Sequence, residues 1–92
     1  MGSSKLSFRM IRERIRAYEG EVFTQIRGGE FKYRVTESAI IPDRTNQNIP
    51  KKHFEQATQS LPLVGTAEVQ HLRGPSYIYA ILMDRRIRQN DW

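Results

Sequence analysis

A Glu-x-Lys stretch comes closest to catalytic spacing in this chain of 92 residues. Glu30 and Lys32 match one half of a nuclease metal site, which needs a second carboxylate within a few ångströms. In the hairpin predicted below, Glu21 lies opposite Thr36, about 20 Å from Glu30 at roughly 3.3 Å per residue. The spacing therefore argues against a nuclease.

Other signatures of enzymes and cofactor sites are missing from the sequence. The two histidines, His53 and His71, stand eighteen residues apart without a metal-binding spacing. The sequence contains no nucleophile elbow, phosphate-binding loop or dinucleotide-binding glycine pattern. The absence of cysteine removes thiolate metal sites and disulfides, and it fits the cytoplasmic location that we expect. We therefore predict no enzymatic activity, no metal and no cofactor.

The clearest pattern is a row of basic side chains near the N-terminus. Four cations recur at spacings of four, three and four: Lys5, Arg9, Arg12 and Arg16. On a helix they fall within a wedge about 60° wide, beside a second wedge about 80° wide that holds apolar residues for the core. Those apolar residues are Phe8, Ile11, Ile15 and Tyr18. Each cation in such a row can neutralise a phosphate, although Glu13 on the same helix partly offsets them.

The charge balance favours an anionic partner without identifying it. Fifteen Lys and Arg against ten Asp and Glu leave a net charge of +5, and eight of the fifteen cations fall within the first thirty-four residues. The alternative is a solvated helix face whose arginine stems cover apolar edges. A membrane partner is not expected, because the apolar stripe is needed for the core and the longest apolar run, residues 77–83, is only seven residues long.

A β-hairpin is predicted where Gly28-Gly29 separates two β-rich runs, residues 21–27 and 30–37. A two-residue turn closed by Arg27 and Glu30 would gather an apolar face from three pairs: Ile26–Phe31, Thr24–Tyr33 and Val22–Val35. The other face would carry three cations, one amide and one ring: Arg27, Lys32, Arg34, Gln25 and Phe23. Such a face can follow a phosphate backbone while the ring stacks on a base. We favour the alternative in which a helix covers Phe23.

Further elements complete an α+β pattern. The first helix runs from about Ser7 to Tyr18, with Ser4 or Ser7 as its N-cap and Gly20 at its end. Residues 39–41 form a short strand, and a second helix runs from residue 50 to about residue 60. The inner face of this second helix consists of Phe54, Ala57 and Leu61.

The last third of the chain allows two interpretations. Residues 66–72 and 76–84 share the outline of a helix-turn-helix, with Gly74 in the turn. However, Gln70 stands where a small residue usually permits helix crossing, Pro75 stands in the turn, and the second segment is unusually apolar. We therefore expect residues 76–84 to form a buried core helix rather than a strand or a DNA-reading helix.

Together these observations predict one compact α+β domain over residues 5–92, with residues 1–4 resembling an added or disordered N-terminus. The domain would contain an N-terminal helix, a three-stranded antiparallel meander and two or three C-terminal helices. The function expected is non-catalytic nucleic-acid binding in an accessory or regulatory protein, with DNA preferred over RNA. The alternative is a protein-interaction module, a homodimer or small inhibitor, that binds through a sheet edge or an aromatic patch. The expected phosphate contacts are Lys5, Arg9, Arg12, Arg16, Arg27, Lys32 and Arg34.

Overall fold

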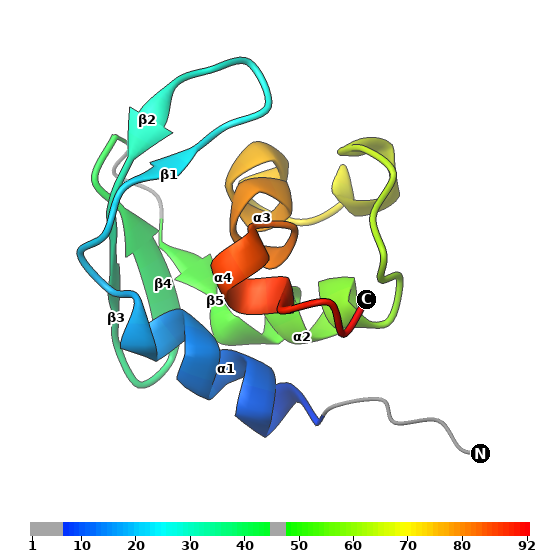
Figure 1. The fold of residues 1–92 in the computed structure, drawn as a ribbon, viewed down its shortest axis with the longest axis horizontal. Helices are drawn as coiled ribbons and strands as arrows, with labels where there is room; N and C mark the ends of the chain where they lie inside the picture. The colour runs from blue at the N-terminus through cyan, green and yellow to red at the C-terminus, as the bar shows by residue number, and fades with distance from the viewer. Residues whose placement is uncertain (1–6, 45–47) are drawn as a thin grey trace.

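The computed structural model describes residues 7–44 and 48–92, so Lys5 and the predicted N-terminal residues 1–4 lie outside the described residues. The fold is the predicted α+β arrangement, with antiparallel strands in two small sheets and helices before and after them. Figure 1 shows that helices α2, α3 and α4 lie together on one side of the strands. Their bounds are α2 (Lys51–Thr58), α3 (Pro75–Leu82) and α4 (Arg85–Arg88).

The first helix, α1 (Phe8–Ala17), confirms the predicted N-terminal element. Ser7 is its N-cap, and its hydroxyl oxygen accepts a hydrogen bond from the backbone N–H of Met10 at 3.4 Å. Ile11 and Ile15 are buried, as the apolar stripe predicts. The helix therefore keeps one stripe in the core and leaves its flank at the surface.

A single extended segment, residues 30–35, connects the two sheets. Its first part, β2 (Glu30–Phe31), pairs with β1 (Phe23–Thr24). Its second part, β3 (Tyr33–Val35), begins the three-stranded meander, which continues through β4 (Ala39–Pro42) and β5 (Ile49–Pro50). Side chains along this segment alternate, so Phe31 and Tyr33 are buried while their neighbours Lys32 and Arg34 are exposed.

The predicted register of the hairpin is wrong by three residues. Phe23 lies opposite Phe31, and the backbone N–H of Gln25 donates to the carbonyl oxygen of Gly29 at 2.7 Å. The loop therefore has three residues, and Gly28 at its third position takes φ +94°, as a type I turn with a glycine bulge requires. Because an odd shift exchanges the faces of a strand, Phe23 points inward.

The corrected register has a clear energetic reason. Phe23 is only 1% exposed, and its ring centre lies 5.1 Å from that of Tyr33 and 6.1 Å from that of Phe31. Val22 and Ile26, which the prediction placed inside, are 43% and 56% exposed. Burying Phe23 against two other rings adds aromatic packing energy to that of its buried area, which Val22 and Ile26 at the rim of the hairpin could not supply.

The predicted position of Glu21 changes with the register. Gly20, the residue before it, donates its backbone N–H to the carbonyl oxygen of Tyr33 at 3.1 Å. Glu21 therefore lies beside the start of β3 and not opposite Thr36, so its separation from Glu30 along the ladder is about 10 Å, at roughly 3.3 Å per residue, and not the predicted value of about 20 Å.

The C-terminal segments settle the interpretation of residues 66–84. The first segment is a single 3₁₀ turn, η1 (Ala67–Val69), instead of a helix to residue 72. The second is helix α3, as predicted, and its side chains Ile78, Ile81 and Leu82 are fully buried. Because α3 forms the centre of the core, the helix-turn-helix outline does not provide a DNA-reading helix.

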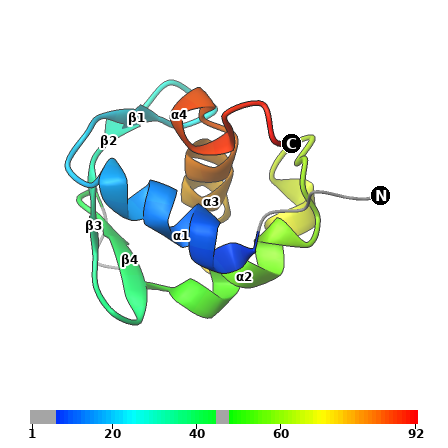
Figure 2. The same cartoon turned by 60° about the horizontal axis from the view of Figure 1, so that its bottom comes forward.

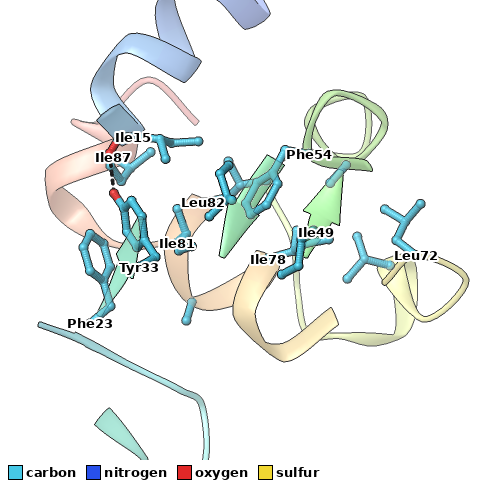
Figure 3. Packing of buried hydrophobic residues seen from close by; sticks show 14 of the residues in the cluster. Ile15, Phe23, Tyr33, Ile49, Phe54, Leu72, Ile78, Ile81, Leu82 and Ile87 are labelled. Atoms are coloured by element: carbon cyan, nitrogen blue, oxygen red, sulfur yellow. Dashed lines mark hydrogen bonds between the residues drawn. The ribbon is translucent and has the colours of Figure 1, made fainter. Parts of the chain in front are cut away.

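Tyr33 connects α1 to the meander at the centre of this core. Figure 3 shows the Tyr33 hydroxyl directed at the backbone of Ile15. This O–H group donates a hydrogen bond to the carbonyl oxygen of Ile15 at 2.5 Å. Burial raises the pKa of Tyr33 well above its usual value, so the hydroxyl stays protonated and remains a donor.

Within the described residues, every helix is too short or too polar to cross a bilayer.

Candidate nucleic-acid interface

The three described cations of the predicted row lie along one flank of α1. Arg9 and Arg16 are exposed, and Arg12 is half-buried. The guanidinium of Arg12 donates to the backbone carbonyl oxygens of Thr36 at 3.4 Å and Glu37 at 3.2 Å. The flank therefore runs beside the turn between β3 and β4, and Figure 2 shows α1 lying next to these strands.

Two further predicted cations, Lys32 and Arg34, lie on the outer face of segment 30–35. Both side chains are exposed, because the residues between and beside them turn into the core. They line one open hollow together with Gly20, which belongs to the turn after α1. The α1 flank reaches the same strand from its other end, since Arg12 contacts the two residues after β3.

We call these five residues the basic surface: Arg9, Arg12, Arg16, Lys32 and Arg34. Glu13 on the same helix moderates its charge, and two further carboxylates lie beside segment 30–35. Glu19 accepts a hydrogen bond from the backbone N–H of Val35 at 2.8 Å, and Asp43 accepts one from the backbone N–H of Lys32 at 3.0 Å. Both carboxylates contact backbone groups, so they leave the cationic side chains available to a partner.

Arg27 does not belong to this surface. It lies in the three-residue loop of the hairpin, where it lines a hollow with Thr66, Gln70 and Ser76. Gln25 at the base of the same loop donates to the hydroxyl of Ser76 at 3.0 Å. Figure 1 shows this loop at the opposite end of the molecule from α1. The structure therefore places three of the seven predicted contacts on the α1 flank and two on the outer face of segment 30–35, with Arg27 apart and Lys5 outside the described residues.

Phe23 is covered, as the favoured prediction had it, and so offers no ring for stacking. Its cover is Arg86 of α4, whose guanidinium carbon lies 4.0 Å from the ring centre. Arg86 also donates to the carbonyl oxygen of Val22 at 2.8 Å. A cation held over an aromatic face in this way stabilises the packing of α4 on β1.

Asp84 holds Arg86 in this position. Its two carboxylate oxygens accept hydrogen bonds from the Arg86 side chain at 2.9 and 3.0 Å, and Oδ1 also accepts the Arg86 backbone N–H. Although burial opposes ionisation, these bonds lower the pKa of Asp84 below its usual value, and the same pairing raises the pKa of Arg86. The sequence reasoning missed this pair, although an Asp just before a short helical run is an N-cap signal.

Arg14, like Arg86, joins two elements of the fold, and it lies on the side of α1 away from the basic surface. It donates to the backbone carbonyl oxygen of Ile87 at 2.9 Å and pairs with Asp91 at 2.6 Å. Its guanidinium carbon lies 6.0 Å from the ring centre of Trp92. Arg14 therefore ties α1 to the end of α4 and serves the fold.

The ion pairs separate the arginines into two groups. Within residues 7–44 and 48–92 there are two ion pairs, Arg14–Asp91 and Arg86–Asp84. None of the five residues of the basic surface takes part in either. The two paired arginines hold elements of the fold together, whereas the basic surface has no described carboxylate within ion-pair distance, as is also true of the exposed Arg27, Arg73 and Arg85 elsewhere.

His53 makes a hydrogen bond within the fold. His53 accepts a hydrogen bond at Nδ1 from the backbone N–H of Arg73 at 3.1 Å. Partial burial and the nearby charges of Lys52, Arg73 and His71 lower the pKa of His53. In the part of the chain that the structure describes, no three acidic or histidine side chains are grouped closely enough to hold a metal ion.

Comparison of the chain with protein-family models, with curated proteins and with solved structures finds no match. The geometry of the basic surface therefore carries the functional argument.

Proposed function

We propose that this protein is a non-catalytic nucleic-acid-binding accessory or regulatory protein, and that its basic surface contacts phosphates. Five cations over α1 and the adjoining strand can each displace a condensed counterion from a nucleic-acid backbone. Contacts of this kind position a protein on nucleic acid and carry no sequence information by themselves.

One observation carries this proposal: the cations of the basic surface have no ion-pair partner among the described residues, whereas Arg14 and Arg86 do. A cation already paired with a carboxylate would have to exchange that partner for a phosphate. An uncompensated one gains the full interaction. The basic surface is therefore freer to take an anionic partner than Arg14 and Arg86 are.

Two double variants with the same change in net charge test the proposal. Arg9→Glu/Arg16→Glu reverses two exposed cations of the basic surface that make no hydrogen bond to another described residue. Arg73→Glu/Arg85→Glu reverses two exposed arginines elsewhere. Binding to a fluorescein-labelled duplex of about 20 base pairs is measured by anisotropy at about 50 mM salt.

The surface variant should bind at least about tenfold more weakly than wild type, because two phosphate contacts are replaced by two repulsions. The matched control should lose about threefold or less, since it changes only the long-range field. Absence of wild-type binding at this salt, both to the duplex and to a single strand of the same length, would contradict the proposal. Equal losses in the two variants would also contradict it, because net charge alone would then explain the binding.

A second candidate function, self-association through the free edge of β1, is favoured by one observation. β1 has a partner strand on one side only, and its flanking residues Val22 and Ile26 are 43% and 56% exposed. Trp92 supports this function less, because its indole N–H donates to the carbonyl oxygen of Leu82 within the fold. Light scattering on wild type and Ile26→Lys tests it. A wild-type dimer that the variant loses is expected, and a monomer at all concentrations would exclude it.

A further inference from the structure

We infer that the basic surface is built for the backbone of a nucleic-acid duplex and not for a single strand. This inference rests on the proposed function and goes further by naming the form of nucleic acid. Three properties of the surface carry it: the direction of its aromatic rings, the spacing of its cations, and the rigidity of the helix that carries most of them.

The aromatic rings of the strands all point into the core, away from the outer face that carries Lys32 and Arg34. Proteins that hold single strands without sequence preference stack bases on exposed rings. Here Phe23, Phe31 and Tyr33 are at most 2% exposed, and they lie on the inner face of the strands. The outer face beside Lys32 and Arg34 carries Ile41 in place of a ring.

The other six rings are buried in the core or packed against it. Tyr77 packs edge-on against Phe31 with ring centres 4.9 Å apart, and the ring of Tyr18 lies under Arg86 at 5.7 Å. Phe8 and Trp92 line a groove with Leu61 along the apolar stripe of α1, beside the basic row. A single strand on the basic surface would therefore gain charge contacts without the stacking energy of about 1–3 kcal/mol per base.

The spacing of the cations suits the higher charge density of a duplex. The row from Arg9 to Arg16 spans about 10 Å of helix axis at 1.5 Å per residue. A duplex presents one negative charge per roughly 1.7 Å of its axis, against one per roughly 3.4 Å for each strand, so this row faces about six charges of a duplex and about three of a single strand. Cations clustered on one rigid helix therefore interact with more phosphate charges on a duplex than on a single strand.

The row is also held in place before any partner arrives. Arg12 is anchored to the carbonyl oxygens of Thr36 and Glu37, and the hydroxyl of Tyr33 fixes the backbone of Ile15 on the same helix. A preformed row loses little conformational freedom on binding. A duplex, which is itself stiff, can meet such a row without first being ordered, whereas a flexible single strand must be ordered along it.

Duplex DNA and duplex RNA share this backbone chemistry, so the test includes both. Anisotropy titrations compare a duplex DNA, a duplex RNA and an unstructured single strand of about 20 nucleotides at about 50 mM salt. Each is repeated with Arg9→Glu/Arg16→Glu and with the control Arg73→Glu/Arg85→Glu. For five phosphate contacts, the steeper counterion release from a duplex predicts binding about tenfold tighter than to the single strand.

Tighter binding of either duplex that the surface variant loses supports the inference, and the two duplex arms show which nucleic acid is preferred. Single-strand binding that equals or exceeds duplex binding, and that the surface variant also loses, overturns the inference and leaves the proposed function standing. Absence of binding in all three arms overturns both. Duplex binding that survives the surface variant also overturns both, because another surface would then be responsible.

Discussion

The guanidinium of Arg86 closes over the ring of Phe23, with 4.0 Å between its central carbon and the ring centre. This contact joins the last helix to the first strand, 63 positions apart in the sequence. Arg86 is one of two arginines that serve the packing of the fold. Arg86 and Arg14 are paired with carboxylates and hold elements together, whereas the arginines along the other flank of α1 remain at the surface.

Replacing Arg86 should destabilise the fold. Arg86→Ala removes the contact over Phe23, the hydrogen bond to Val22 and both bonds to Asp84, so we expect a loss of about 2–3 kcal/mol in the free energy of unfolding. Arg85→Ala is the matched control, because Arg85 is exposed and makes no side-chain hydrogen bond to a described residue. It should change stability by no more than about 0.5 kcal/mol. Urea denaturation measures both, and equal stabilities of the two variants would show that the Arg86 contacts contribute nothing.

The hydroxyl of Tyr33 makes a second specific prediction. Tyr33→Phe keeps the ring but removes the hydrogen bond to the carbonyl oxygen of Ile15, and we expect a loss of about 1 kcal/mol in the free energy of unfolding. Tyr79→Phe removes a hydroxyl that has no hydrogen bond to a described residue and should be close to neutral. A thermal melt that shows no difference between these two variants would mean that the Tyr33 bond does not stabilise the packing of α1.

Two glycines in the left-handed region should respond differently to alanine. Gly28 and Gly74 have φ of +94° and +65°, so alanine at either position costs about 1–2 kcal/mol in backbone strain. A Cβ at Gly28 would meet nothing within 4 Å, whereas a Cβ at Gly74 would lie 2.6 Å from Cδ1 of the buried Ile49. Gly74→Ala should therefore be more destabilising than Gly28→Ala by about 1–3 kcal/mol. Chemical denaturation of the two variants decides this, and the opposite order would contradict the packing described around Ile49.

His53 should make stability depend on pH. Its pKa in the folded protein lies below the ordinary value of about 6.5, so the folded state binds protons less readily than the unfolded chain. Its contribution is complete above pH ~6.5 and is lost as the pH falls below that value. His53→Gln should flatten the stability profile between pH ~7.5 and ~5.5, and His71→Gln should change it less, because His71 is only the smallest contributor to the lowered pKa of His53. An unchanged slope in His53→Gln would rule out this residue as the cause.

The sequence predicted the helices better than the strands, and the reason is physical. The N-terminal helix and the helices near residues 50–60 and 76–84 follow from local signals such as the Ser7 cap, Pro50 and Pro75, and from periodic apolar residues. The hairpin register depends instead on which ring is buried against which, and that is decided by partners across the sheet. Aligning Phe23 with Phe31 would have pointed to the three-residue loop ending at Gly28.

The site was predicted in part for the same reason. The α1 row follows from helical periodicity, and the outward direction of Lys32 and Arg34 follows from alternation along one strand. The separation of Arg27 could not be predicted, because it depends on the register of β1. The structural roles of Arg14 and Arg86 depend on carboxylates 77 and two residues away, Asp91 and Asp84, and only the nearer one leaves a local signal.

The most direct test of the central claim is the salt dependence of duplex binding. Five phosphate contacts predict that the logarithm of the association constant falls with the logarithm of salt concentration at a slope of about −4 to −5 for wild type. In Arg9→Glu/Arg16→Glu this slope should become shallower by about 2, while Arg73→Glu/Arg85→Glu keeps the wild-type slope. A surface variant with the wild-type slope would contradict the assignment of phosphate contacts to the basic surface.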